Sequence, residues 1–103
     1  MPDKNLRGLY VLTPERFDAA SMQRIQSALK CGVSYLQYRD KSRPEGQKLK
    51  IAQQLAAWCR EYGSVFIVND HVSIARAVNA DRIHHTLGHT EYVAYSRRQI
   101  APE

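Results

Sequence analysis

Two groups of polar side chains follow short apolar runs at residues 33–36 and 65–68, and their types suit phosphate chemistry. They are Gln37, Arg39 and Lys41 after the first run, and Asn69 and Asp70 after the second. If both runs are parallel strands, their carboxyl ends meet at one edge of a sheet, which is where α/β proteins bind ligands. The sequence therefore predicts that these five side chains form one site.

The donors in this set match a phosphorylated ligand. Arg and Lys form strong, charge-assisted hydrogen bonds to phosphate oxygens, and an amide adds a neutral donor. Asp70 offers a carboxylate, and Mg²⁺ is commonly held by one or two carboxylates together with substrate phosphates. The set predicts binding of a diphosphorylated small molecule bridged by Mg²⁺.

Each of these residues also has a structural alternative. Arg39 and Lys41 could belong to a solvated loop, and Gln37 could form hydrogen bonds inside the sheet. Asn69 could hold a turn. Asp70 could cap the helix expected after it, because a carboxylate accepts hydrogen bonds from the free amides of a first helical turn.

The composition favours a single globular domain over residues 1–103, with 44% hydrophobic residues. No apolar run has the length of a membrane-spanning helix, and the N-terminal residues do not resemble a signal peptide. We therefore expect a cytoplasmic protein with no membrane partner. The net charge of +5 suits anionic small molecules, whereas the scattered placement of the basic residues argues against nucleic acid as a partner.

Strand-like and helix-like patterns alternate along the chain. Strands are expected at 8–12, 33–36, 65–68 and 82–84, and helices at 22–29, 49–59, 74–78 and 91–100. Such alternation predicts parallel strands in the order 1-2-3-4, joined by right-handed crossovers. Four βα units form half of a (β/α)₈, or TIM, barrel, which usually needs about 250 residues. Because a four-stranded sheet leaves two open edges, we expect self-association, most simply a homodimer whose two halves close one barrel.

Cysteine and histidine give weaker signals. Cys31 and Cys59 fall on expected helices and are predicted to be buried free thiols. His84, His85 and His89 are close enough in the chain to suggest zinc, but no Cys or carboxylate is spaced to complete the site. Surface histidines are therefore the favoured interpretation.

These motifs resemble the N-terminal half of the thiamine phosphate synthase family, also called thiamine-phosphate pyrophosphorylase. The segments that carry the resemblance are 6–13, 32–42, 59–72 and 79–81. The resemblance implies a transferase of thiamine biosynthesis that couples hydroxymethylpyrimidine diphosphate to thiazole phosphate and releases pyrophosphate. It also implies catalytic roles for Arg39 and Lys41, which with Gln37 would contact the pyrimidine and diphosphate. Asn69 would contact the diphosphate, and Asp70 would ligate Mg²⁺.

The sequence departs from the family pattern after residue 81. Arg82 stands where the family has glycine, and two residues are inserted before Glu91, the one carboxylate that could serve as the second Mg²⁺ ligand. The loops that hold thiazole phosphate in the family have no counterpart in these 103 residues. We therefore expect impaired turnover from this chain alone. The alternative function is a non-catalytic, phosphate-binding half-barrel that self-associates.

Overall fold

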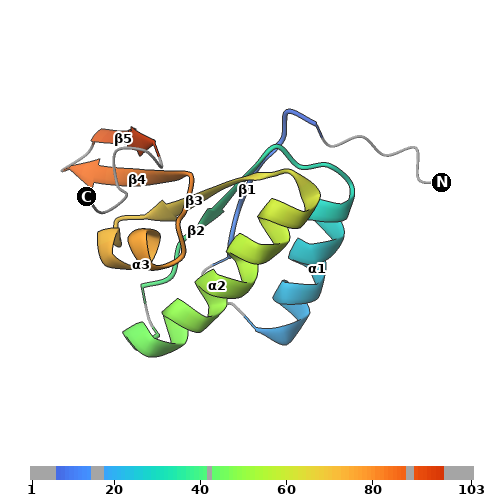
Figure 1. Ribbon diagram of the computed structural model, residues 1–103, viewed down its shortest axis with the longest axis horizontal. Helices are drawn as coiled ribbons and strands as arrows, with labels where there is room; N and C mark the ends of the chain where they lie inside the picture. The colour runs from blue at the N-terminus through green and yellow to red at the C-terminus, as the bar shows by residue number, and fades with distance from the viewer. Residues whose placement is uncertain (1–6, 15–17, 42, 88–89, 97–103) are drawn as a thin grey trace.

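A five-stranded sheet with the strand order β1-β2-β3-β4-β5 forms one layer of the fold, and the helices lie against one of its faces (Figure 1). The structure is a computed structural model that describes residues 7–14, 18–41, 43–87 and 90–96, with side chains described as far as Ile83. The elements are β1 (Tyr10–Leu12), α1 (Ala19–Lys30), β2 (Tyr35–Tyr38), α2 (Glu45–Tyr62), β3 (Val65–Asn69), α3 (Val72–Ala77), β4 (Arg82–Leu87) and β5 (Thr90–Ser96).

The first four strands are parallel and in sequence order, which confirms the predicted half-barrel topology of alternating strands and helices. The predicted strand at 33–36 is displaced, because Val33 still donates its N–H to Ala28 O in the turn after α1. The strand that forms is Tyr35–Tyr38, so Gln37 lies within β2 rather than after it.

The expected helix at 91–100 is wrong over the described residues. Thr90–Ser96 forms β5, which pairs antiparallel with β4. The segment is rich in Thr, Tyr and Val, which favour strands, and its pairing covers the outer edge of β4 that a four-stranded sheet would leave open. Residues 97–100 of that prediction lie outside the described part of the chain.

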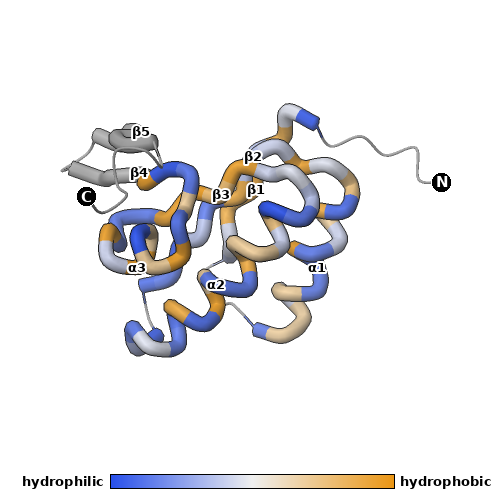
Figure 2. Tube along the Cα trace, viewed as in Figure 1, coloured by the Kyte–Doolittle hydropathy of each residue, from blue (hydrophilic) through white to orange (hydrophobic). Residues whose placement is uncertain are grey.

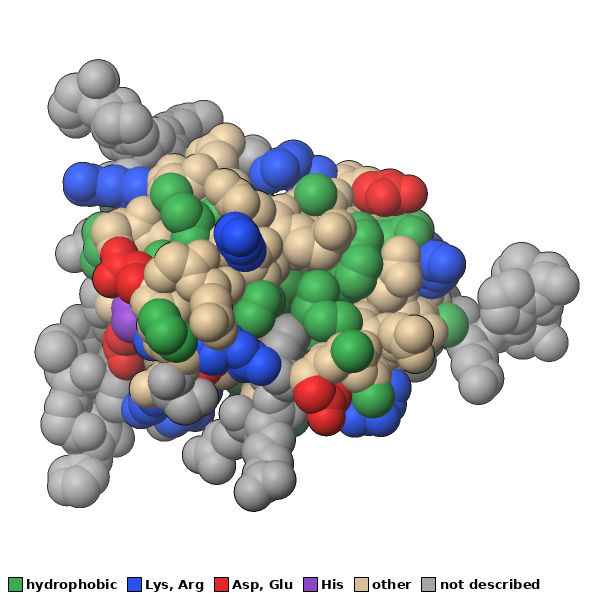
Figure 3. Space-filling view, turned by 90° about the horizontal axis from the view of Figure 1, so that it is seen from below, with side chains coloured by type: hydrophobic (Ala, Val, Ile, Leu, Met, Phe, Trp, Pro, Cys, Tyr) green, Lys and Arg blue, Asp and Glu red, His purple; other side chains and the backbone are tan. Residues whose placement is uncertain are grey.

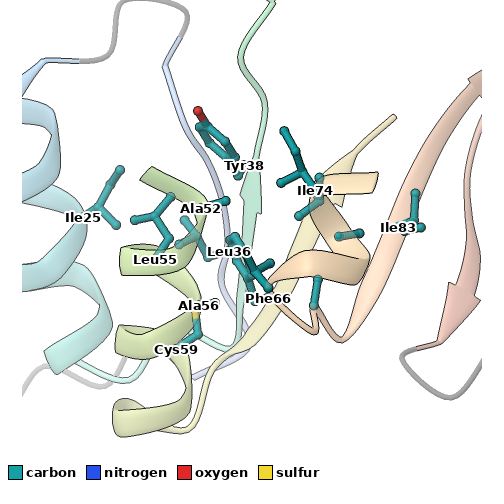
Figure 4. Packing of buried hydrophobic residues seen from close by; sticks show 14 of the residues in the cluster. Ile25, Leu36, Tyr38, Ala52, Leu55, Ala56, Cys59, Phe66, Ile74 and Ile83 are labelled. Carbon is teal, nitrogen blue, oxygen red and sulfur yellow. The ribbon is translucent and has the colours of Figure 1, made fainter. Parts of the chain in front are cut away.

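One hydrophobic cluster joins the three described helices to the same face of the sheet. Leu36 of β2, Phe66 of β3 and Leu55 of α2 belong to this cluster, and all three are nearly inaccessible to solvent (Figure 4). β3 is mainly hydrophobic, whereas hydrophobic and hydrophilic residues alternate along α1 and α2 (Figure 2). Helices on one face are typical of a barrel wall, because a doubly wound sheet carries helices on both faces.

Local signals explain where the helices begin and end. Asp18 caps α1 by accepting a hydrogen bond from the Ser21 N–H at 2.9 Å, and this bond lowers the pKa of the Asp18 carboxyl. Gly63 ends α2 with a φ of 80°, as predicted for a C-cap glycine. The end of α2 at Gly63 sets where β3 begins.

The cysteines are free thiols, as predicted. Cys59 is buried in α2, and burial raises the pKa of its thiol to about 12. Cys31, which was expected to be buried on a helix, is only partly buried and lies at the C-cap, just after the last residue of α1. Among the described helices, none combines the length and the apolar character needed to cross a bilayer.

Candidate functional site

The carboxyl ends of β2 and β3 bring the predicted site residues to one edge of the sheet. Tyr38 pairs with Val68 in the parallel register, so Arg39 follows β2 beside Asn69, the last residue of β3. Arg39 is partly exposed, and both Lys41 and Asp70 are exposed. The structure thus places two cations and a carboxylate where an anionic ligand could reach them, with the buried Asn69 beside them; their roles as ligand contacts stay predictions.

A chain of hydrogen bonds crosses the face of the sheet opposite the helices. Asn69 Nδ2 donates to Gln37 Oε1 at 3.1 Å, and Gln37 Nε2 donates to the Tyr10 hydroxyl at 2.6 Å. Gln37 is 1% exposed and Asn69 is 3% exposed. The structural alternative for Gln37, a hydrogen bond inside the sheet, is therefore realised, and this bond fixes the amide of Asn69.

Thr13 holds the main chain of Arg39 and was not predicted as part of the site. Its Oγ1 accepts from the Arg39 N–H at 2.9 Å and donates to the Arg39 carbonyl at 3.0 Å, while its own N–H donates to Gln37 O at 3.0 Å. Thr13 directly follows β1, so the rule that placed the other residues at the carboxyl edge could also have identified it.

Asp40 supports the loop that carries Arg39 and Lys41. Its carboxylate accepts hydrogen bonds from the Tyr38 hydroxyl and from Arg43 Nη1, both at 3.0 Å. The Asp40 side chain is 1% exposed and that of Arg43 is 27% exposed. Burial, together with the hydrogen bond to Asp40, raises the pKa of Tyr38 far above its usual range. Asp40 is therefore a structural member of the Gln37–Lys41 motif.

Replacing Asp40 with alanine is expected to lower the free energy of unfolding by about 1–3 kcal/mol, because the buried Tyr38 hydroxyl loses its acceptor. Chemical denaturation would measure the loss. Asp18→Asn is a suitable control, since asparagine caps a helix about as well as aspartate. An unchanged denaturation midpoint for Asp40→Ala would contradict this structural role.

Asp70 does not cap α3, so that alternative is wrong. The N-cap is His71, whose side chain makes no capping hydrogen bond. Asp70 instead has a φ of 61°, and the His71 N–H donates to Asn69 O at 2.8 Å, closing a three-residue turn around Asp70. A helix cap normally has extended backbone, whereas positive φ is a turn conformation that aspartate adopts more readily than most residues.

Glu91, the predicted second metal ligand, belongs to β5. Its backbone pairs with Thr86 near the carboxyl end of β4, which separates it from β3. The side chains of Glu91, His84 and His85 lie outside the described part of the structure, as does the whole of His89, so the zinc alternative stays open. Among the side chains that are described, no group of three His, Cys, Asp or Glu forms a ready metal site. Asp70 alone still fits Mg²⁺, which keeps several waters and takes further ligands from substrate phosphates.

The charges elsewhere on the molecule do not gather into one basic surface on the face seen in Figure 3. Lys and Arg side chains lie apart there, with hydrophobic and acidic side chains between them. This scatter agrees with the sequence-based preference for a small anionic ligand over nucleic acid.

Comparisons with known proteins agree with this fold. A family model described as thiamine monophosphate synthase matches residues 9–103. A thiamine-phosphate synthase of Aromatoleum aromaticum is 45% identical over 85 residues, which are 82% of this chain and 41% of that protein. One from a Janthinobacterium species is 42% identical over 100 residues, or 96% of this chain and 48% of that protein. A solved thiamine phosphate pyrophosphorylase from Pyrococcus furiosus has a TM-score of 0.67 at 34% identity, covering 78% of this chain and 39% of its own. The chain thus spans about half the length, or less, of these relatives.

Proposed function

Since this chain belongs to the thiamine monophosphate synthase family, we propose that the carboxyl edge of β2 and β3 binds the diphosphate of hydroxymethylpyrimidine diphosphate. The reaction is its coupling to thiazole phosphate, with release of pyrophosphate. The observation that carries the proposal is the juxtaposition of Arg39 with Asn69 and Asp70 across two paired strands.

The proposed roles follow from the charge that develops on the leaving diphosphate. Arg39 and Lys41 donate hydrogen bonds to its oxygens and stabilise the negative charge, which is the largest contribution that fixed donors make to such a reaction. Asn69 adds a neutral donor, and Asp70 would hold Mg²⁺, with Glu91 of β5, across β4, as the proposed second carboxylate. Mg²⁺ bound there supplies further positive charge to the diphosphate.

Gln37 has a more specific role in this proposal than a substrate contact. Its amide is 1% exposed and is hydrogen bonded at both ends, to Asn69 and to Tyr10. We propose that Gln37 orients the Asn69 side chain, so that this amide is already in position when the substrate binds. Orientation of this kind lowers the barrier because the entropy of positioning is lost on folding rather than during the reaction.

We further propose that the 103-residue chain alone forms thiamine phosphate far more slowly than its longer relatives. The part that it shares with them is about half of their length, and the diphosphate edge lies in that part. Reaction also needs thiazole phosphate held in line with the leaving group. The experiment is a thiamine phosphate assay on the purified chain beside a full-length relative. Comparable rates would overturn the proposed impairment, whereas absence of pyrophosphate binding would overturn the proposed site.

A second candidate, the self-associating half-barrel, is favoured by the open edge of β1. This strand lies at the end of the sheet, and Leu9, Tyr10 and Leu12 are 51%, 45% and 52% exposed. We propose a homodimer that covers this edge. Closure of one eight-stranded barrel by two copies, as first expected, conflicts with the pairing of β5 along the outer edge of β4.

Light scattering tests the proposed homodimer. A mass near twice 11.8 kDa is expected for the wild type, and Leu12→Lys is expected to shift it to the monomer, because lysine on an edge strand opposes pairing. A wild-type monomer at micromolar concentration would contradict the proposal.

Because its proposed substrates are small, water-soluble phosphate esters, we place the protein in the cytoplasm, with no membrane or nucleic-acid partner.

A further inference from the structure

Lys48 is a buried cation beside the candidate site. It lies in the N-terminal part of α2 and is only 7% exposed, although lysine is almost never fully buried unless it is paired. Its Nζ lies 3.2 Å from His71 Nε2. An ammonium group only donates, and Nε2 can accept this hydrogen bond in the tautomer that carries its proton on Nδ1. The contact joins α2 to the residue that follows Asp70.

The segment that Lys48 reaches is a tight and unfavourable turn. The hydrogen bond from the His71 N–H to Asn69 O closes it, and Asp70 at its centre has a φ of 61°. Turns of this size with positive φ at the central residue are rare and strained. Such a conformation persists when its surroundings over-determine it.

Both residues that flank Asp70 are anchored by a side chain from another element. Asn69 is held from β2 by the amide of Gln37, and His71 is held from α2 by Lys48. The two anchors come from different elements and act on opposite sides of Asp70. An apolar side chain in place of Lys48 would avoid the cost of burying an ammonium group, so the cation is best explained by the contact it makes.

We infer that Lys48 is a positioning residue, which acts through His71 to hold the Asn69–Asp70–His71 turn at the carboxyl edge. The inference rests on the proposed function only where it makes Asp70 a Mg²⁺ ligand. The geometry of the turn itself can be tested without any ligand.

The first test is amide hydrogen exchange at His71, measured by NMR on the full chain. Lys48→Met keeps the apolar stem and removes the donor, and it is expected to speed exchange at His71 about tenfold, as for loss of a hydrogen bond to a charged group. Lys48→Arg should restore slow exchange. Lys50→Met is the matched control, because Lys50 is an exposed lysine on the same helix. Equal acceleration of His71 and of core amides such as that of Leu55 would indicate general destabilisation and overturn the inference.

The second test is the affinity for pyrophosphate in the presence of Mg²⁺, measured by calorimetry. Lys48→Met is expected to weaken it about tenfold, the effect typical of residues that orient a metal ligand. In an Asp70→Asn background the same substitution should have no further effect, because Lys48 acts through that turn. Wild-type affinity in Lys48→Met would overturn the inference and leave the proposed function intact. Absence of Mg²⁺-dependent binding in the wild type would overturn the proposed function and the metal role of the turn, while His71 exchange still decides whether Lys48 holds it.

Discussion

Replacing Asp70 with asparagine is expected to abolish the Mg²⁺ dependence of pyrophosphate binding by this chain. Asp70 is exposed at the carboxyl edge, and its neighbour Asn69 is fixed by Gln37. Asparagine keeps the shape and tolerates the positive φ, but it lacks the charge that attracts a divalent cation. Residues that only orient a metal ligand contribute about 10- to 100-fold to affinity, so loss of the ligand itself should cost at least about 100-fold. Calorimetry with and without Mg²⁺ measures the difference.

Asp18→Asn is the matched control for this substitution. It removes the same charge from the chain, and asparagine can accept the same hydrogen bond from the Ser21 N–H at the start of α1. Its affinity for pyrophosphate with Mg²⁺ should equal that of the wild type. If Asp70→Asn binds pyrophosphate with an undiminished response to Mg²⁺, Asp70 is not the metal ligand.

Arg39→Ala is expected to weaken pyrophosphate binding by about 1.5–3 kcal/mol, the value for a hydrogen bond to a charged group. Because about 1.4 kcal/mol corresponds to a tenfold change in the dissociation constant, this is a loss of affinity of roughly 10- to 150-fold. The Thr13 hydroxyl binds both the N–H and the carbonyl of Arg39, so alanine at position 39 should leave the loop in place. The effect is therefore one of lost ligand contact rather than of local unfolding.

Arg60→Ala provides the comparison for Arg39→Ala. Arg60 lies in the last turn of α2, away from the carboxyl edge, and it is exposed. The two variants have the same net charge, so a general electrostatic attraction would weaken equally in both. Equal affinities for the two variants would remove Arg39 from the site.

The three described βα units were predictable because their signals are local. A continuously apolar run such as 65–68, followed by residues at helical spacing, has few other interpretations in a soluble chain. The segment from Thr90 to Ser96 was assigned wrongly, because its conformation depends on pairing with β4 rather than on its own spacing. Strand pairing of this kind is a tertiary effect that overrides local pattern.

The rule that ligands bind at the carboxyl ends of parallel strands predicted which residues meet at the site. It did not predict which contacts hold them there. Arg39 and Asn69 were placed together because each follows a strand, and the register of β2 and β3 brings them together. The supports come from distant parts of the chain, as in the bonds of Thr13 to Arg39 and of Lys48 to His71. No local pattern reveals that Thr13 binds the main chain of Arg39 or that Lys48 binds His71. The cap proposed for Asp70 failed because its backbone has a positive φ, and the N-cap of α3 is His71.

The most direct test of the proposed diphosphate site is an NMR titration of the isotope-labelled chain with pyrophosphate, with and without Mg²⁺. We expect that Mg²⁺ strengthens binding and that the largest amide shifts fall on Arg39, Lys41, Asn69 and Asp70. Amides in the last turns of α1 and α2, at the opposite edge, should stay unchanged. Shifts centred on that opposite edge, or none at millimolar pyrophosphate, would contradict a diphosphate site at the carboxyl ends of β2 and β3.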